Sequence, residues 1–224
     1  MQSNIMYQPS FSLLQLIMEE GESVLAEAGA MVSMTPNVQM QTQARGGILG
    51  GLKRAVLGGE SFFINTFECT GGQGEMTLAP SLPGDMIHVP MSGGTLFVQS
   101  GSYVAGSAGI NVDTQWGGAK TFFSKEGLFL LKCEGAGDLY LSSYGAVHAV
   151  QLVQGQSYIV DTGHMVAFES TVQYNVKAVG GMKETFLSGE GLVCHLTGPG
   201  RIYLQTRSME AFLKFLIPRL PNKG

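Results

Sequence analysis

The sequence predicts an all-β protein with a short C-terminal helix, and three observations predict this fold class. Glycine is abundant, at 32 of 224 residues, while charged residues make up only 13%, about half of the share usual in soluble domains. Apolar and polar residues alternate in many short segments. One pattern, Gly-x-Gly-x-x-x-Leu, recurs at equal intervals of 63 residues, as GQGEMTL (72–78), GAGDLYL (135–141) and GPGRIYL (198–204). Together they indicate many strands joined by turns in three tandem β-repeats.

A longer unit precedes each of these fragments. Fourteen residues align without a gap in GESVLAEAGAMVSM (21–34), GGTLFVQSGSYVAG (93–106) and GQSYIVDTGHMVAF (155–168). Each copy has a second glycine eight residues after the first and a valine three residues later, at Gly29 and Val32, Gly101 and Val104, and Gly163 and Val166. Repeats of this kind complete the hydrophobic layers of their neighbours.

Alternating segments predict the strands of each unit in order. A leading strand occupies residues 11–18, 86–91 or 146–153, and another alternating stretch follows the aligned unit at 38–43, 110–115 or 172–179. After a Gly-Gly pair and a connecting stretch comes a further strand, such as ESFFINTFEC (60–69), which Gly-x-Gly joins to the last strand. Period-two alternation is typical of half-buried strands.

The three units span approximately residues 1–80, 81–143 and 144–207. No linker-like segment separates them, so we predict one structural domain over residues 1–224. Packing about a pseudo-threefold axis is a natural arrangement for three such copies.

The repeated glycines favour a structural role. Gly-x-Gly joins two predicted strands here, whereas a phosphate-binding loop leads into a helix. We therefore interpret these glycines as turn positions that need a positive φ or a close approach of two backbones.

The end of the chain predicts a helix over residues 208–217. Ser208 is a suitable N-cap and Pro218 should stop the helix near Ile217. An apolar stripe of Met209, Phe212, Leu213 and Leu216 is widened by Phe215 and Ile217. Such a helix should bury itself against another surface.

Several segments carry a resemblance to a known family. GESVLAEAGAMVSM, GGESFF, VDTGHMVAF, GEGLVCHLTGPGRIYLQTR and the phenylalanine-rich terminal helix resemble the altered-inheritance-of-mitochondria family over nearly the whole chain. The resemblance implies a fold similar to the trp RNA-binding attenuation protein, with shortened double-stranded β-helix units of sandwich-like type, often in symmetric assemblies. It implies no catalytic residue, substrate or cofactor, and a shared fold does not transfer RNA binding.

Charge and cysteine content restrict the classes of function. The net charge is −4, but residues 201–224 carry five cations and one acid, which leaves −8 for the rest of the chain. This balance argues against binding to nucleic acid. Three irregularly spaced cysteines predict neither a disulfide framework nor a metal site. We expect a cytoplasmic protein, because no signal peptide or membrane span is evident.

Three glutamates occupy the same place in the three units. Glu60, Glu126 and Glu190 precede corresponding strands in a chain where charge is scarce. They could form a ring of carboxylates that binds a cation or a basic group. The plainer interpretation, which we favour, is that each accepts hydrogen bonds from a neighbouring turn or pairs with a nearby lysine or arginine.

The first unit contains an insertion, GGILGGLKRAVLGG (46–59). Leu49 and Leu52 with Lys53 and Arg54 could contact a lipid surface or a neighbouring protomer, as could Lys214 in the terminal helix. The plainer alternative is a short loop or helical turn folded over the edge of the core.

The histidines and cysteines suggest no catalysis. Cys194 and His195 are neighbours on a predicted strand, so their side chains should point to opposite faces. No pair of histidines or cysteines has metal-ligand spacing, and we expect no cofactor. The three cysteines should pack as small apolar groups.

Two functional hypotheses follow. The first is a non-enzymatic scaffold or interaction protein that forms a trimer or larger symmetric homo-oligomer and touches a membrane peripherally. The alternative is a carrier of a small ligand or metal, with its site between repeats or at the symmetric glutamates.

Overall fold

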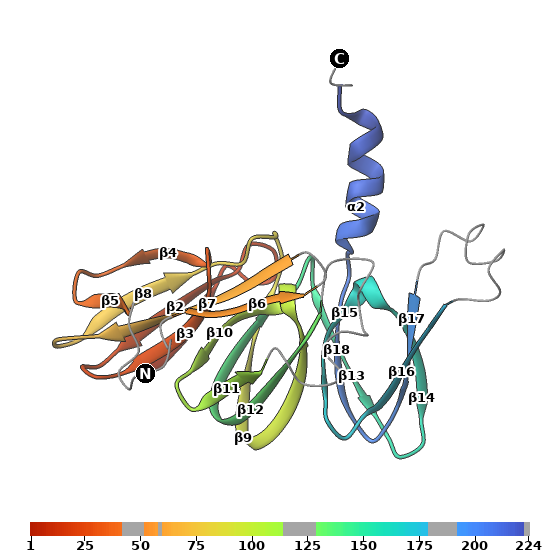
Figure 1. Ribbon diagram of the computed structural model, residues 1–224, viewed down its shortest axis with the longest axis horizontal. Helices are drawn as coiled ribbons and strands as arrows, with labels where there is room; N and C mark the ends of the chain where they lie inside the picture. Colours follow the sequence, from red (N-terminus) through yellow and green to blue (C-terminus); the bar gives the residue numbers. More distant parts are fainter. Residues whose placement is uncertain (42–51, 58–59, 114–128, 179–191, 222–224) are drawn as a thin grey trace.

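The computed structural model describes residues 1–41, 52–57, 60–113, 129–178 and 192–221. These residues form a mainly β structure with one short α-helix, as the sequence predicts (Figure 1). The structure extends along one axis, with β1–β8 at one end, β9–β12 in the middle and β13–β18 at the other end (Figure 1).

The first group of strands contains β1 (Gln2–Met6), β2 (Leu13–Met18), β3 (Ser23–Glu27), β4 (Met31–Met34), β5 (Val38–Gln41), β6 (Leu52–Leu57), β7 (Glu60–Cys69) and β8 (Gly74–Leu78). The second contains β9 (Met86–Gln99), β10 (Tyr103–Ser107), β11 (Ile110–Asp113) and β12 (Leu130–Ser142). The third contains β13 (Val147–Leu152), β14 (Ser157–Asp161), β15 (Met165–Glu169), β16 (Gln173–Ala178), β17 (Leu192–Thr197) and β18 (Gly200–Gln205). Helix α2 (Met209–Leu216) follows, with a 3-10 turn at Ile217–Arg219.

Within the described residues, the strands form three sheets. The longest has eleven strands along the path β13-β18-β15-β9-β12-β10-β3-β7-β5, with β11 attached to β12 and β6 attached to β7. A four-stranded sheet has the order β1-β2-β8-β4, and a three-stranded sheet has the order β14-β17-β16. Strand β1, which the sequence did not predict, pairs antiparallel with β2.

Strands β9 and β12 differ from the predicted pattern because each runs unbroken through a position where the other groups turn. Both pass through the glycines at which the sequence predicts turns, and their mutual register shifts between Glu134 and Ala136. Strand β9 pairs with β15 of the third group, and β12 pairs with β10, which pairs with β3 of the first group. The middle group is therefore joined to both neighbours.

The first glycine of the aligned unit has the positive φ that was predicted, including Gly93, where β9 continues without a turn. Gly21, Gly93 and Gly155 have φ values of 84°, 99° and 74°, which side chains other than glycine rarely adopt. The second glycine of Gly-x-Gly is needed for close packing, because a Cβ at Gly74 would lie 2.6 Å from Val38 and one at Gly200 would lie 2.6 Å from Thr171.

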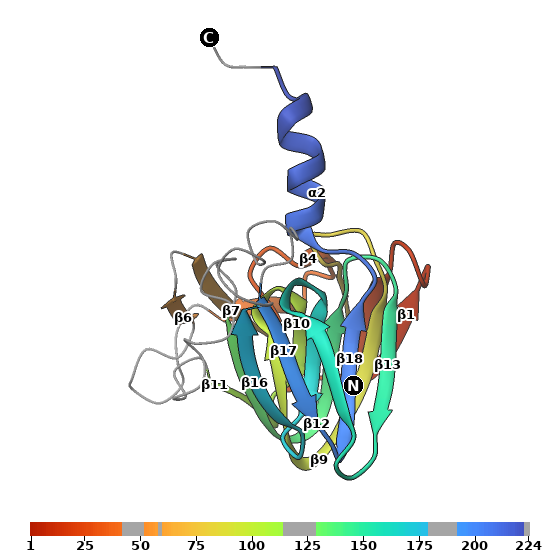
Figure 2. The same cartoon turned by 90° about the vertical axis from the view of Figure 1, so that its right-hand side faces the viewer.

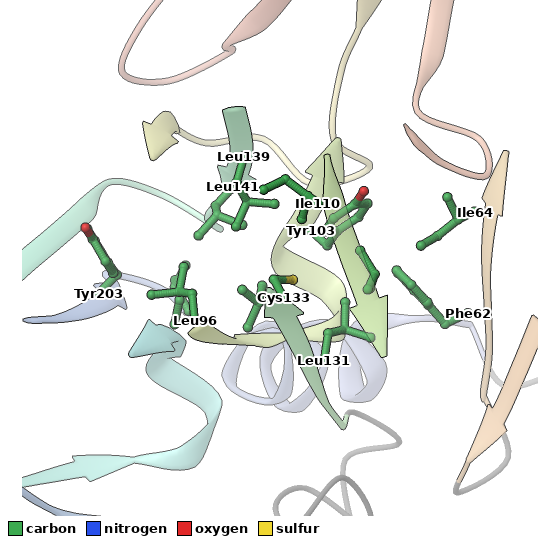
Figure 3. Close-up of a cluster of buried hydrophobic side chains, with 14 of the residues drawn as sticks. Phe62, Ile64, Leu96, Tyr103, Ile110, Leu131, Cys133, Leu139, Leu141 and Tyr203 are labelled. Carbon is green, nitrogen blue, oxygen red and sulfur yellow. The ribbon is translucent and has the colours of Figure 1, made fainter. Parts of the chain in front are cut away.

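Three hydrophobic clusters form the core. The first cluster includes Leu14, Leu16, Met18, Val24, Ala26, Met76, Leu78, Met86, Val104, Ala105 and Tyr140. The second cluster, shown in Figure 3, includes Phe62, Ile64, Leu96, Val98, Leu131, Cys133, Leu139, Leu141, Val166, Ala167 and Tyr203. The third cluster contains Leu130, Leu152, Val160, Met165, Phe168, Val172, Cys194, Leu196 and Ile202. All three cysteines are buried and free, as predicted.

Candidate functional site

The symmetric glutamates are only partly placed by the structure. Glu60 begins β7, where its backbone lies opposite Leu57 of β6. Glu126 and Glu190 lie outside the described residues. The carboxylate ring therefore stays a prediction.

The insertion in the first unit contains a strand, so the predicted loop or helical turn is wrong for residues 52–57. Strand β6 pairs antiparallel with β7 from Leu52 opposite Asn65 to Leu57 opposite Glu60. Lys53 and Arg54 lie on this strand, and Leu49 lies outside the described residues. The sequence of this strand, LKRAVL, does not alternate between apolar and polar residues, so its pattern did not indicate a strand.

Helix α2 stands away from the β body in both views (Figures 1 and 2). The hydroxyl of Ser208 accepts a hydrogen bond from the Ala211 amide over 3.2 Å and caps the helix. No residue of α2 is buried. The described residues therefore do not cover the apolar stripe that was expected to be buried. Phe215 and Ile217 are 58% and 61% exposed.

Charged side chains on α2 and on the 3-10 turn that follows it are held by local contacts. Lys214 pairs with Glu210 one turn earlier at 2.6 Å, and the Arg219 guanidinium lies 4.0 Å from the centre of the Phe215 ring. Phe212 makes an edge contact with Tyr144, with ring centres 6.1 Å apart. This contact connects the start of the helix to the β body.

Two contacts between strand groups have the same register. In the first joint, Ala105 of β10 lies opposite Ala26 of β3, and Ser107 lies opposite Val24. In the second joint, Ala167 of β15 lies opposite Val98 of β9, and Glu169 lies opposite Leu96. In the fourteen-residue alignment Ala105 corresponds to Ala167 and Ala26 to Val98, so both joints pair the same two aligned positions.

Each joint inserts three corresponding side chains into the neighbouring cluster. Val104, Ala105 and Tyr140 enter the first cluster, and Val166, Ala167 and Tyr203 enter the second. The register of the strand that carries the valine also shifts at this residue, both in β10 and in β15. The bulge increases local twist and redirects the side chain, so the aligned valine reaches the neighbouring core.

The corresponding strand of the first group, β4, has a different environment. Its register with β8 shifts at the aligned residue Val32, as in the other two strands. Val32 is nevertheless 57% exposed, whereas Val104 and Val166 are 0% exposed. Among the described residues, β4 pairs only with β8.

Strand β14 presents a second open edge at the opposite end of the structure (Figure 1). It corresponds to β3 and to the later part of β9, each of which pairs on both sides. In the described part of the chain, β14 pairs only with β17, and Ile159 is 60% exposed. The sequence did not predict that β4 and β14 have open edges. The alignment did show that Val32 corresponds to Val104 and Val166, both of which are buried.

Among the described residues, a few titratable side chains have notable surroundings. His88 and Asp138 form an exposed pair at 2.7 Å, and the histidine ring stacks on Tyr140. Burial raises the pKa of the Cys133 and Cys194 thiols to about 12, so neither is a thiolate at neutral pH. Burial also raises the pKa of Glu27, at the end of β3, to about 7.

A cavity of about 280 Å³ lies where the first group of strands leads into the second. It is lined by Phe11, Ser12 and residues 79–84. These residues carry no titratable side chain, so the cavity offers apolar and hydroxyl contacts only.

Two searches of the described residues gave negative results. No group of three or more histidine, cysteine, aspartate or glutamate side chains there has a metal-binding arrangement. None of the helices in the described ranges is long and apolar enough to cross a lipid bilayer.

Known proteins match nearly the whole chain. An uncharacterised protein of Streptococcus pyogenes serotype M6 is 30% identical over 222 residues, which is 96% of this chain and 89% of that protein. A crystal structure of a Streptococcus pyogenes protein has a TM-score of 0.78 and 26% identity, and covers 98% of this chain and 99% of that chain. The mitochondrial biogenesis AIM24 family matches residues 3–207. The chain, with its mainly β structure and short terminal helix, therefore belongs to the AIM24 family.

Proposed function

We propose that this protein is a non-enzymatic scaffold that forms a symmetric homo-oligomer and contacts an anionic membrane surface through helix α2. The observation that carries the membrane contact is α2 itself, an apolar helix with no buried residue that stands off a β body. In this proposal the three strand groups are three copies of one unit, and they supply a rigid base for the helix.

Charge supports an anionic partner for the helix. Residues 201–224 carry a net charge of +4 in a chain of net charge −4, and three of their cations, Arg207, Lys214 and Arg219, lie on or next to the helical segment. An interfacial helix buries its apolar side chains at the headgroup boundary while its lysines and arginines contact anionic lipids. The basic pair Lys53 and Arg54 on β6 supplies two further cations for this attraction.

Vesicle co-sedimentation tests the membrane contact. Wild-type protein should bind vesicles that contain phosphatidylserine, and binding should be lost when Phe212, Phe215 and Ile217 are replaced together by serine. Phe11→Ser is a matched control, because Phe11 is also highly exposed but lies on the β body. Charge reversal at Lys53, Arg54 and Lys214 should weaken binding, most strongly at low salt. Equal binding by wild type and the triple serine variant would reject α2 as the contact.

Native mass spectrometry tests the oligomer independently of the lipid. A single defined multiple of the protomer mass is expected, because closed symmetric assemblies have fixed stoichiometry. A monomer at every concentration would reject the oligomer and leave the helix proposal intact.

A carrier of a small ligand is the second candidate, favoured by the cavity at Phe11 and residues 79–84. Retained mass in the same native spectra would support it. Simultaneous Glu60→Gln, Glu126→Gln and Glu190→Gln should abolish retention if the glutamates hold the ligand. Equal retention in that variant would place the ligand elsewhere.

A further inference from the structure

We propose that strand β4 of one copy pairs with strand β14 of a second copy, head to tail, in the register of the two internal joints. The inference rests on the proposed homo-oligomer and names the surface that builds it. Its starting point is the pairing of the two internal joints, β10 with β3 and β15 with β9. Strands β4 and β14 occupy the aligned positions, but in the described residues they do not pair with each other.

The register follows from the alignment. The first joint pairs Gly106 with Leu25, and the second pairs Phe168 with Phe97. The same aligned positions in the open strands are Met34 and Ile159. Met34 of one copy should therefore lie opposite Ile159 of the next, with Ser33 opposite Val160 and Thr35 opposite Tyr158.

Side-chain contacts in the second joint show what this pairing achieves. The Phe97 and Phe168 rings have their centres 5.3 Å apart, so the paired positions pack against each other across the joint. Met34 and Ile159 are both exposed apolar side chains in the single chain. Pairing would cover both, and burial of apolar surface is the main driving force of such association.

The sheets also match. In the eleven-stranded sheet, each joint connects a trio of the type β9-β12-β10 to a trio of the type β3-β7-β5. The separate sheets β1-β2-β8-β4 and β14-β17-β16 contain the corresponding trios with no joint between them. A contact between β4 and β14 would convert these two sheets into another copy of the joined arrangement.

The partner is a second copy because the two strands lie at opposite ends of the long axis (Figure 1). Neither strand contains the lysine or proline with which isolated proteins often protect an exposed edge. The contact joins two different surfaces, so it repeats from copy to copy, and it gives the proposed symmetric oligomer when the rotation between copies closes a ring.

Corresponding residues predict a weaker contact than the internal joints. Ser33 stands where the internal joints have Ala105 and Ala167, and Thr77 stands where they have Tyr140 and Tyr203. The hydroxyls of Ser33 and Thr77 lie 2.6 Å apart and share a hydrogen bond. A joint with less apolar surface should be reversible on dilution.

Disulfide trapping in the full chain tests the register. Met34→Cys protein mixed with Ile159→Cys protein should give a cross-linked band of twice the protomer mass under mild oxidation, and neither variant alone should give it. Met31→Cys is the matched control, because Met31 is equally exposed on β4 but three residues out of register; its cross-linking should be largely lost. The natural cysteines are buried and should not compete. Equal cross-linking by the Met31 and Met34 variants would overturn the register.

Native mass spectrometry of Ile159→Lys separates this inference from the proposed function. A lysine on the edge of β14 should reduce the oligomer to protomers, while Phe11→Lys, at another exposed site, should leave it intact. An oligomer that survives Ile159→Lys would overturn the β4–β14 contact and keep the scaffold. A wild-type protein that is always a monomer would overturn both the contact and the oligomer, without affecting vesicle binding by α2.

Discussion

Strand β4 and strands β10 and β15 come from the same aligned segment, yet they have opposite environments. The aligned valine lies at a register shift in all three strands. It is buried in β10 and β15, where a neighbouring strand group covers it, and exposed in β4 at the end of the row. The difference teaches that burial at this position depends on a neighbour and not on the strand itself.

The comparison also explains why the first group carries smaller and more polar side chains at the joint positions. The hydroxyls of Ser33 and Thr77 satisfy each other by a hydrogen bond. Tyr140 and Tyr203, at the position of Thr77, are buried in a neighbouring cluster. Polar groups that bond locally suit an open edge, because exposed apolar edges promote aggregation.

The largest effect should come from a charge at the aligned valine. Val104→Asp and Val166→Asp should each lower the free energy of unfolding by about 4 kcal/mol, because they bury an unpaired carboxylate. Val32→Asp should change it by less than about 0.5 kcal/mol, as an exposed substitution does. Equilibrium urea unfolding of dilute protein measures both. A similar loss in all three variants would break the comparison.

Tyrosine truncation should have the next largest effect. Tyr140→Ala should cost about 3 kcal/mol of unfolding free energy because it leaves a cavity in the first cluster. Thr77→Ala, at the corresponding position, should cost about 1 kcal/mol, mostly for its hydrogen bond to Ser33. The same urea titrations give both values, and an equal cost would show that Thr77 is as tightly packed as Tyr140.

Glu27 should make the stability of the first joint depend on pH. Burial raises its pKa to about 7 from an ordinary value of 4.5, so the folded chain holds a proton between these values that the unfolded chain releases. Stability therefore falls as the pH rises through this window. Glu27→Gln should match wild type below pH 4.5 and be more stable above pH 7 by on the order of 2 kcal/mol.

Thermal unfolding of both proteins at pH 4.5 and pH 8 checks this sign. Gln99 occupies the position of Glu27 in the second unit, so Gln99→Ala is a control that changes the corresponding site without a titrating group. A constant difference between wild type and Glu27→Gln at the two pH values would contradict the assigned cause.

The smallest effect should come from the cap of α2. Ser208→Ala should cost the helix about 1 kcal/mol because the Ala211 amide loses its acceptor, while Ser208→Asp should preserve the helix. Hydrogen exchange of the α2 amides should accelerate in the alanine variant only. Unchanged exchange in α2 would show that contacts with the β body, such as that between Phe212 and Tyr144, stabilise the helix instead.

Much of the fold could be predicted from local pattern. Period-two alternation located strands such as β2, β5 and β16, and Ser208 located the start of α2, because these features depend on neighbours in sequence. Residues 52–57 do not alternate between apolar and polar side chains, so the pattern did not reveal β6. The continuity of β9 and β12 through glycine-containing turns could not be predicted either, since it depends on pairing with distant strands.

The candidate site was predicted less well. Lys53, Arg54 and Lys214 were selected because charge beside apolar residues is visible in sequence, and all three lie on described elements. The exposed strand edges at Val32 and Ile159 were not selected, because segments with the same sequence pattern form buried strands elsewhere in the chain. An edge becomes a surface only when the strand that would cover it is missing.

The sequence by itself determined the family, the mainly β composition, the recurrent valine and glycine positions and the apolar terminal helix. Tertiary structure decided which copy of each position is covered, because hydrogen bonds between strands and packing between clusters join residues that are far apart in the chain. The alignment makes Val32, Val104 and Val166 equivalent. Only the order of the strand groups makes Val32 the valine that faces outward.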